Sequence, residues 1–229
     1  MIKKHIPNTI TSCNLISGCI AIYFAFCGDQ ALAFLFIVLG AVFDFFDGMS
    51  ARLLGVSSPI GKELDSLADV TTFGVAPSAM VFSLLYFHQA LDKLGVWGEY
   101  LPFVAFVMAA FSALRLAKFN LDERQTTSFI GLPTPANALF WASLIVGCER
   151  LLTTSLWSLV AVVVLVFVMS YMLIAELPMF ALKFKHWGWK GNEVKYIFAI
   201  SSLLLIILLG TSGFAAIIIW YILLSLAVK

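Results

Sequence analysis

The chain has 229 residues, of which 62% are hydrophobic and only 12% are charged. Its mean hydropathy of +1.00 leaves too few polar residues to cover the surface of a soluble domain. The formal net charge of +1 supplies no basic face for nucleic acid, and the 4 cysteines lack the paired spacing of zinc or redox motifs. The composition therefore predicts an integral membrane protein and excludes a soluble enzyme, a disulfide scaffold and a nucleic-acid-binding protein.

Apolar segments long enough to cross a hydrocarbon core of about 30 Å follow one another along the chain. They are expected at about 9–27, 30–50, 62–87, 100–118, 134–149, 156–180, 194–210 and 213–228. Glycine-rich and proline-containing breaks separate them, such as Gly28-Asp29 and 210–213. We predict an all-α, polytopic integral membrane protein with about eight transmembrane helices, organised as one domain over residues 1–229.

The basic residues are distributed unequally between the two ends of these segments. With the N-terminus in the cytoplasm, the cytoplasmic ends carry Lys3, Lys4, Arg52, Lys62, Arg115, Lys118, Arg124, Lys183, Lys185, Lys190, Lys195 and Lys229. Only Lys93 and Arg150 fall on the other side. Because basic residues are retained on the cytoplasmic side, we expect both termini to face the cytoplasm, in the cytoplasmic (inner) membrane. Polar residues interrupt the first apolar segment, so we expect it to be retained rather than cleaved as a signal peptide.

Four aspartates lie inside the second and third apolar segments, where each charge costs about 2.5–3.5 kcal/mol at the bilayer centre. Asp44 and Asp47 are three residues apart, and Asp65 and Asp69 are four apart, so each pair shares a helix face. The turn at 55–59 folds the two helices side by side, and we expect all four carboxylates to converge. Two Mg²⁺ or Mn²⁺ ions would suit this cluster and would clamp a diphosphate. The alternatives are a proton or ion pathway, or a helix end that extends into water.

The residues between the aspartates favour a phosphate ligand. Gly48 lets a ligand approach the backbone, and Ala51 keeps the helix thin one turn later. Arg52 is a forked donor suited to phosphate. Gly61 opens the third helix, whose N-terminal N–H groups favour an anion.

The whole pattern, Asp44-x2-Asp47-Gly48-x2-Ala51-Arg52-x8-Gly61-x3-Asp65-x3-Asp69, resembles the complete signature of the CDP-alcohol phosphotransferases. The resemblance implies that a hydroxyl attacks a nucleotide-activated lipid or alcohol, CMP leaves and a phosphodiester forms. It also implies the fold of that family, a catalytic core at 7–150 followed by additional transmembrane helices at 151–229, and a homodimer. The roles that it implies are metal ligation by Asp44, Asp47, Asp65 and Asp69, general-base action by Asp69, and CDP contacts from Gly48, Ala51, Arg52 and Gly61.

Two further segments bear on the substrates. Asn8 and Thr11 lie at the start of the first helix, where they form either a wall of the nucleotide site or a polar membrane interface. The strings at 115–120 and 129–138 resemble elements of the polytopic phosphatidylserine synthases, with Lys118 in place of the usual second arginine. This resemblance implies CDP-diacylglycerol as donor, L-serine as acceptor and CMP as product. Arg115, Lys118 and Asn120 are the candidates for binding the serine carboxylate or the phosphate.

Other acceptors and another class of protein stay open. Within the family, the acceptor could be glycerol 3-phosphate or inositol phosphate, or the donor could carry an archaeal diether lipid. A phosphorylated acceptor should require a denser basic cluster than Arg115 and Lys118 provide. An ion-coupled transporter could also use buried carboxylates, but it would not need Gly48, Ala51 and Arg52 between them.

Overall fold

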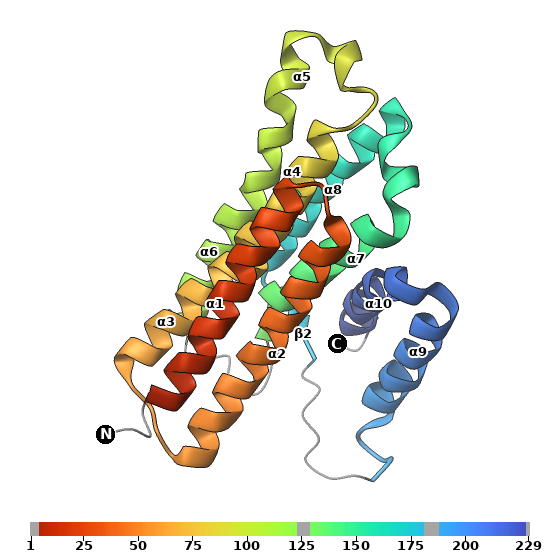
Figure 1. Cartoon of the computed structure of the whole chain (residues 1–229). Coiled ribbons are helices and arrows are strands. Elements are labelled where there is room, and N and C mark those ends of the chain that lie inside the picture. The colour runs from red at the N-terminus through yellow and green to blue at the C-terminus, as the bar shows by residue number, and fades with distance from the viewer. Residues whose placement is uncertain (1–4, 123–128, 181–187, 228–229) are drawn as a thin grey trace.

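The computed structural model of the protein describes residues 5–122, 129–180 and 188–227. Its elements, shown in Figure 1, are α1 (His5–Phe26), α2 (Gln30–Leu54), α3 (Pro59–Asp69), η2 (Val70–Val75), α4 (Ala76–Tyr86), η3 (Leu91–Leu94), α5 (Val96–Tyr100), η4 (Leu101–Phe106), α6 (Val107–Leu121), β1 (Phe129–Ile130), α7 (Thr134–Thr153), α8 (Leu156–Ile174), β2 (Pro178–Met179), α9 (Glu193–Leu209), η5 (Gly210–Ser212) and α10 (Gly213–Ala227). Six of the basic residues used to predict orientation lie outside the described ranges: Lys3, Lys4, Arg124, Lys183, Lys185 and Lys229.

The helices form a bundle in which α1 and α2 lie side by side and α9 and α10 form a hairpin (Figure 1). Within the described residues, six helices are long and apolar enough to cross a membrane: His5–Phe26, Gln30–Leu54, Pro59–Tyr86, Val96–Leu121, Leu156–Ile174 and Glu193–Ala227. The prediction of an all-α membrane protein is confirmed. The number of eight spans is not confirmed, because α7 is absent from this set and α9 to α10 counts as one segment.

A π-helical turn, η2, interrupts the third span directly after Asp69, where we expected one regular helix. The wider turn places Thr72 against α1, and its hydroxyl donates a hydrogen bond of 3.0 Å to the carbonyl oxygen of Asn14. Gly18 on α1 and Gly40 on α2 make room for Thr72, because a side chain at either position would overlap it. The π turn therefore joins α1, α2 and the third span at one closely packed point beside Asp69.

The helix that we expected over 156–180 ends at Ile174, so its last six residues are a correction. Ala175 is extended, and Pro178 forbids a helical conformation at the residue before it. Residues 178–179 instead form β2, which pairs antiparallel with β1 (Phe129↔Met179, Ile130↔Pro178). This short ribbon connects the chain before α7 to the chain after α8.

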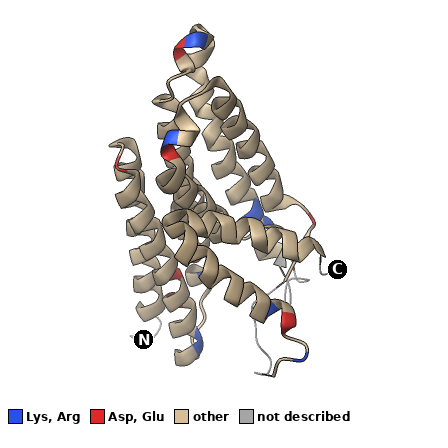
Figure 2. Ribbon diagram, turned by 90° about the vertical axis from the view of Figure 1, so that its right-hand side faces the viewer, with Lys and Arg blue, Asp and Glu red and all other residues tan. Residues whose placement is uncertain are grey.

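The charged residues lie mostly near the ends of the helices (Figure 2). Lys93 lies in η3 and Arg150 in the last turns of α7, at the end of the bundle away from the N-terminus. Acidic residues also occur part of the way along α2 and α3. The aspartates of α2 and α3 therefore lie within the apolar bundle rather than at the ends of the membrane-spanning segments.

The packing around Thr72 gives a test of the fold. A Cβ atom at Gly18 would lie 2.8 Å from Thr72 Cα and 3.0 Å from its backbone nitrogen, so Gly18→Leu forces the helices apart. We expect a loss of about 1–3 kcal/mol of stability, seen as a lower melting temperature in detergent. Cys19→Leu is the matched control, because Cys19 is exposed on the same helix. Equal melting temperatures for the two variants would show that close packing at Gly18 is not required.

Candidate active site

Three carboxylates from two helices meet at the centre of the site. Ligand oxygens of Asp44 and Asp47 on α2 and of Asp65 on α3 all lie within 4.8 Å of one another. The turn between the helices begins at Gly55, whose φ of 60° is left-handed, and ends at Ser58, whose Oγ accepts a hydrogen bond of 3.0 Å from the Gly61 N–H. This turn brings α3 back alongside α2 and so forms the cluster.

Asp69 lies one turn beyond Asp65 and is not part of this group of three. Its side chain is buried, and its Oδ1 accepts a hydrogen bond of 3.3 Å from Asn14 Nδ2. It is still close enough to interact electrostatically with Asp44, Asp47 and Asp65. The expected cluster of four is therefore a cluster of three with Asp69 beside it, deeper in the bundle.

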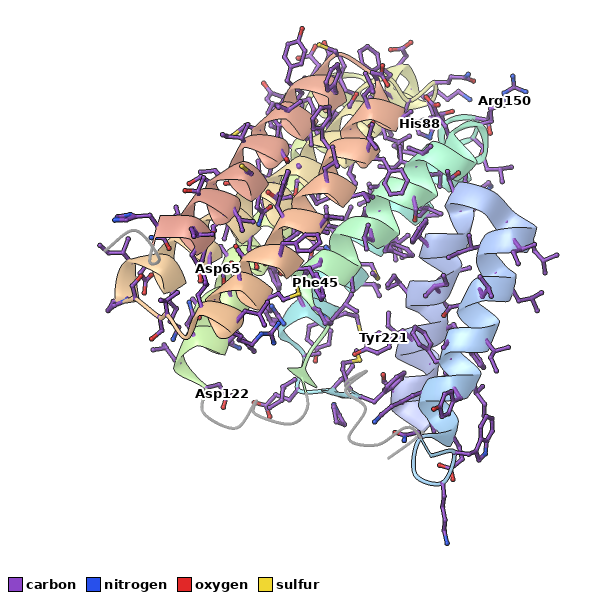
Figure 3. All side chains as sticks on the ribbon, turned by 60° about the horizontal axis from the view of Figure 1, so that its bottom comes forward. Phe45, Asp65, His88, Asp122, Arg150 and Tyr221 are labelled. Carbon is purple, nitrogen blue, oxygen red and sulfur yellow. The ribbon has the colours of Figure 1, made fainter. Side chains whose placement is uncertain are left out.

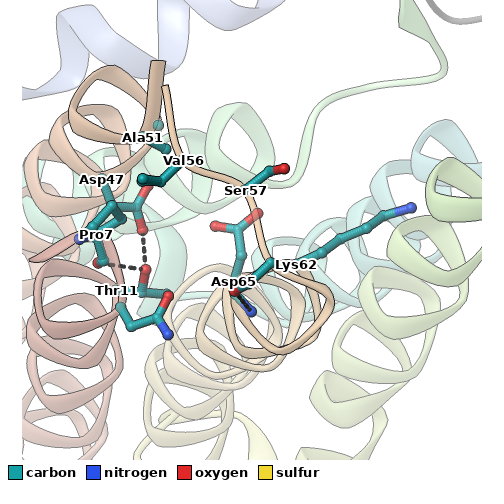
Figure 4. A pocket seen from close by; sticks show the side chains of 12 residues that line it. Pro7, Thr11, Asp47, Ala51, Val56, Ser57, Lys62 and Asp65 are labelled. Atoms are coloured by element: carbon teal, nitrogen blue, oxygen red, sulfur yellow. Dashed lines mark hydrogen bonds between the residues drawn. The ribbon is translucent and has the colours of Figure 1, made fainter. Parts of the chain in front are cut away.

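Thr11 on α1 orients one member of the cluster. Its hydroxyl donates a hydrogen bond of 2.6 Å to Asp47 Oδ2, and it also lies 3.0 Å from the carbonyl oxygen of Pro7 (Figure 4). Both Thr11 and Asp47 are buried. We expected Thr11 either to form a wall of the nucleotide site or to lie at a polar membrane interface, and the structure shows that it holds a carboxylate in position.

A cavity of about 280 Å³ opens next to the cluster (Figure 4). It is lined by Pro7, Asn8, Thr11, Asp47, Gly48, Ala51, Val56, Ser57, Ser58, Gly61, Lys62 and Asp65. Five of the six expected CDP contacts are in this set: Asn8, Thr11, Gly48, Ala51 and Gly61. A side chain at Gly48 would meet no other atom within 4 Å, so the backbone there is open to a ligand.

Arg52 is the expected CDP contact that is not in the cavity lining. It is exposed, and its Nε donates a hydrogen bond of 3.0 Å to the carbonyl oxygen of Gly48. Lys62 is a basic residue that does line the cavity, and sequence reasoning did not single it out as a possible CDP contact. Its Nζ donates a hydrogen bond of 3.1 Å to the carbonyl oxygen of Asn120, which links α3 to the end of α6. The available signal was its position next to Gly61, in the first turn of the helix.

The three candidates for the acceptor site have different surroundings. Arg115 is only 7% exposed, lies over the ring of Phe119 at 5.1 Å and interacts electrostatically with Asp69. Lys118 is exposed. Asn120 Nδ2 donates a hydrogen bond of 2.8 Å to Ser66 Oγ on α3. The structure therefore gives Arg115 an electrostatic interaction with Asp69, Asn120 a hydrogen bond to α3, and Lys118 an exposed position.

The chemistry of the carboxylate cluster fits hard divalent cations. Carboxylates held this close together repel one another unless protons or cations neutralise them. Oxygen donors on facing helices are the ligands that Mg²⁺ and Mn²⁺ prefer. Asp44, Asp47 and Asp65 are thus the residues that could hold such an ion, with Asp69 close by.

Comparison with known proteins gives the same family as the signature. The sequence pattern of the CDP-alcohol phosphatidyltransferase family matches residues 4–167. A Bacillus subtilis protein named CDP-diacylglycerol–serine O-phosphatidyltransferase is 40% identical over 132 residues, 58% of this chain and 70% of its own length. Proteins of the same name are 31% identical over 203 residues in Methanocaldococcus jannaschii, covering 88% of this chain and 83% of the relative, and 35% identical over 135 residues in Helicobacter pylori, covering 58% and 54%. The chain belongs to the CDP-alcohol phosphatidyltransferase family.

Proposed function

We propose that the protein transfers the phosphatidyl group of CDP-diacylglycerol to the hydroxyl group of L-serine, which gives phosphatidylserine and CMP. The observation that carries this proposal is a cluster of three carboxylates, two of which (Asp47 and Asp65) line a cavity with an open backbone at Gly48. The names of the relatives support serine as the acceptor. The buried cation of Arg115 is a suitable partner for the serine carboxylate or for a phosphate.

The donor is proposed to bind between α1, α2 and α3. The cavity there receives the cytidine diphosphate group. The small residues Gly48, Ala51 and Gly61 leave room for it, and Lys62 adds a positive charge. Two divalent ions bound by the aspartates would neutralise the diphosphate. The acyl chains then remain among the lipids, because α2 and α3 are both within membrane-spanning segments.

Asp69 is proposed to accept the proton of the serine hydroxyl. Its position one turn deeper than Asp65 places it beside the cluster rather than at its centre, and Asn14 fixes its carboxylate. The serine oxygen then attacks the lipid-side phosphorus, and the bond from that phosphorus to the CMP oxygen breaks with its electron pair leaving on CMP. The reaction depends mainly on neutralising the charge of the diphosphate and on aligning the serine oxygen with the phosphorus.

The proposal also includes orientation and assembly. We place the carboxylate end of the bundle at the cytoplasmic face of the inner membrane, because the described Lys93 and Arg150 lie at the other end. Both termini are then cytoplasmic, and CMP is released into the cytoplasm. A homodimer is carried over from the family resemblance alone.

Metal dependence is the first expected property of this site. Purified protein should bind Mn²⁺, followed by electron paramagnetic resonance, and chelation should abolish transfer until Mg²⁺ or Mn²⁺ is restored. Asp65→Asn should weaken Mn²⁺ binding strongly, because it removes one charge from the cluster without changing its shape. Asp92→Asn in η3 is the control, since Asp92 lies at the other end of the bundle. Full activity in metal-free buffer would contradict the mechanism.

The identity of the acceptor can be tested with a panel of hydroxyl compounds. Incubation with CDP-diacylglycerol should give the largest yield, measured by mass spectrometry of the lipid product, with L-serine. Arg115→Ala should raise the KM for serine, or for the lipid, far more than Arg150→Ala at the other end of the bundle does. If glycerol 3-phosphate or inositol phosphate outcompetes serine, the family assignment stands and the proposed acceptor is wrong.

The role of Asp69 can be separated from that of the other aspartates. Asp69→Asn should lower kcat by about 10²- to 10⁴-fold, the usual contribution of a general base, while CDP-lipid binding is kept. Asp44→Asn, at the carboxylate cluster, should lose CDP-lipid binding as well. Equal losses of binding in the two variants would make Asp69 a ligand rather than the base. Near-normal turnover of Asp69→Asn would exclude it from the mechanism.

A further inference from the structure

A buried polar side chain on α7 has no partner in the described part of the chain. Asn137, in the first turn of that helix, is fully buried, and neither its Nδ2 nor its Oδ1 makes a hydrogen bond to a described residue. Trp141, one turn later on the same side, is also fully buried, and its Nε1 is equally unpaired. An unpaired buried polar group costs about 1–3 kcal/mol, so a primary amide with both ends unpaired is a candidate for binding a polar ligand.

Tyr221 on α10 presents a second polar group (Figure 3). Its side chain is 8% exposed, and its hydroxyl donates a hydrogen bond of 2.9 Å to the carbonyl oxygen of Phe180. Because the proton is used in this bond, the phenol oxygen keeps its lone pairs for another donor. Tyr221 also interacts electrostatically with Arg115.

Helix geometry places Asn137 and Tyr221 at the same depth. Helices α7 and α10 pack together, and a side chain at Gly147 on α7 would overlap Ser212, immediately before α10. The two helices are roughly antiparallel, so the residues before Gly147 and the residues after Ser212 extend to the same side of this contact (Figures 1 and 3). At 1.5 Å per residue, Asn137 lies about 15 Å from Gly147, and Tyr221 lies about 14 Å from Ser212.

Two observations connect these residues to the proposed reaction centre. Arg115 interacts electrostatically with both Asp69 and Tyr221. Helix α7, which carries Asn137, packs against η2, which begins directly after Asp69, and also against α10, which carries Tyr221.

We propose that Asn137 and Tyr221 bind the charged groups of a zwitterionic amino-acid acceptor. The inference rests on the proposed function and extends it to a recognition site. Asn137 Nδ2 donates to the carboxylate together with Arg115, and Asn137 Oδ1 and the Tyr221 oxygen accept from the ammonium group. A neutral amide that offers both a donor and an acceptor matches a zwitterion, whereas a phosphorylated polyol carries no ammonium group and would leave both acceptor oxygens unpaired.

The proposal gives a role to the C-terminal hairpin, α9 and α10. These helices lie outside the segment 4–167 that matches the family, and the sequence alone assigned them none. The Phe180 ring packs edge-on against the Tyr221 ring with the centroids 4.8 Å apart, and the Phe198 ring is tilted against it at 5.8 Å. This aromatic packing restrains the phenol of Tyr221.

The test measures the KM for the acceptor, the KM for CDP-diacylglycerol and the melting temperature of the full chain in detergent. Asn137→Leu keeps the volume of the side chain and removes its polar atoms, and Tyr221→Phe removes only the hydroxyl. Each should raise the KM for serine about ten-fold or more, the loss expected for one hydrogen bond to a charged group, and leave the KM for CDP-diacylglycerol within two-fold. The controls are Ser143→Ala, a buried hydroxyl on α7 already bonded to the Phe140 carbonyl, and Tyr171→Phe, a tyrosine 63% exposed on α8.

The outcomes distinguish this inference from the proposed function. An unchanged KM for serine in Asn137→Leu, together with an equal or higher melting temperature, would show that the amide binds water or nothing and would overturn the proposal. An equal rise in the KM for CDP-diacylglycerol would also overturn it, because Asn137 would then belong to the donor site. Should Asn137→Leu not fold, Tyr221→Phe alone decides by the same measurements. If the wild-type protein rejects serine, the proposed function fails, and a zwitterion site is supported only where another amino alcohol or amino acid is the best acceptor.

Discussion

Mutual repulsion among carboxylates in an apolar bundle is the constraint on which the rest of this structure depends. Asp44, Asp47 and Asp65 lie within 4.8 Å of one another, with Asp69 one turn further in. No isolated pair of helices would hold these charges together in lipid, since each alone would move toward water. The neighbouring helices therefore have to supply both the force that keeps α2 and α3 together and the hydrogen bonds that orient the carboxylates.

Helix α1 supplies most of that support. Thr11 bonds Asp47 and Asn14 bonds Asp69, so two hydrogen bonds from one helix reach both sides of the carboxylate group. Gly18, further along α1, admits Thr72 and brings the third span into close contact. Packing of small residues and a few buried hydrogen bonds are the usual means of holding membrane helices together, because the hydrophobic effect does not act between helices in lipid.

Sequence reasoning predicted the helical class, the family and the residues of the carboxylate cluster. Charged residues in an apolar segment and the spacing of the signature residues can both be read directly from the sequence. Sequence reasoning did not predict the π turn after Asp69 or the end of α8 at Ile174, since both depend on contacts with other helices and on the pairing of β2 with β1. It proposed Arg115, Lys118 and Asn120 for the acceptor site, but it did not single out Tyr221. Tyr221 interacts electrostatically with Arg115 from more than one hundred positions along the chain, and no local pattern marks such an interaction.

The π turn has a consequence for how the third span can vary. One extra residue in a helical turn rotates everything that follows by about 100° relative to a regular helix. The side chains of α4 that form the core, such as Met80 and Leu84, are therefore in phase with the bundle only while the turn is present. Loss of a single residue between Val70 and Val75 would restore a regular helix and direct a different face of α4 into the core, although the aspartates themselves would be untouched. The length of this segment is thus under a stricter constraint than its composition.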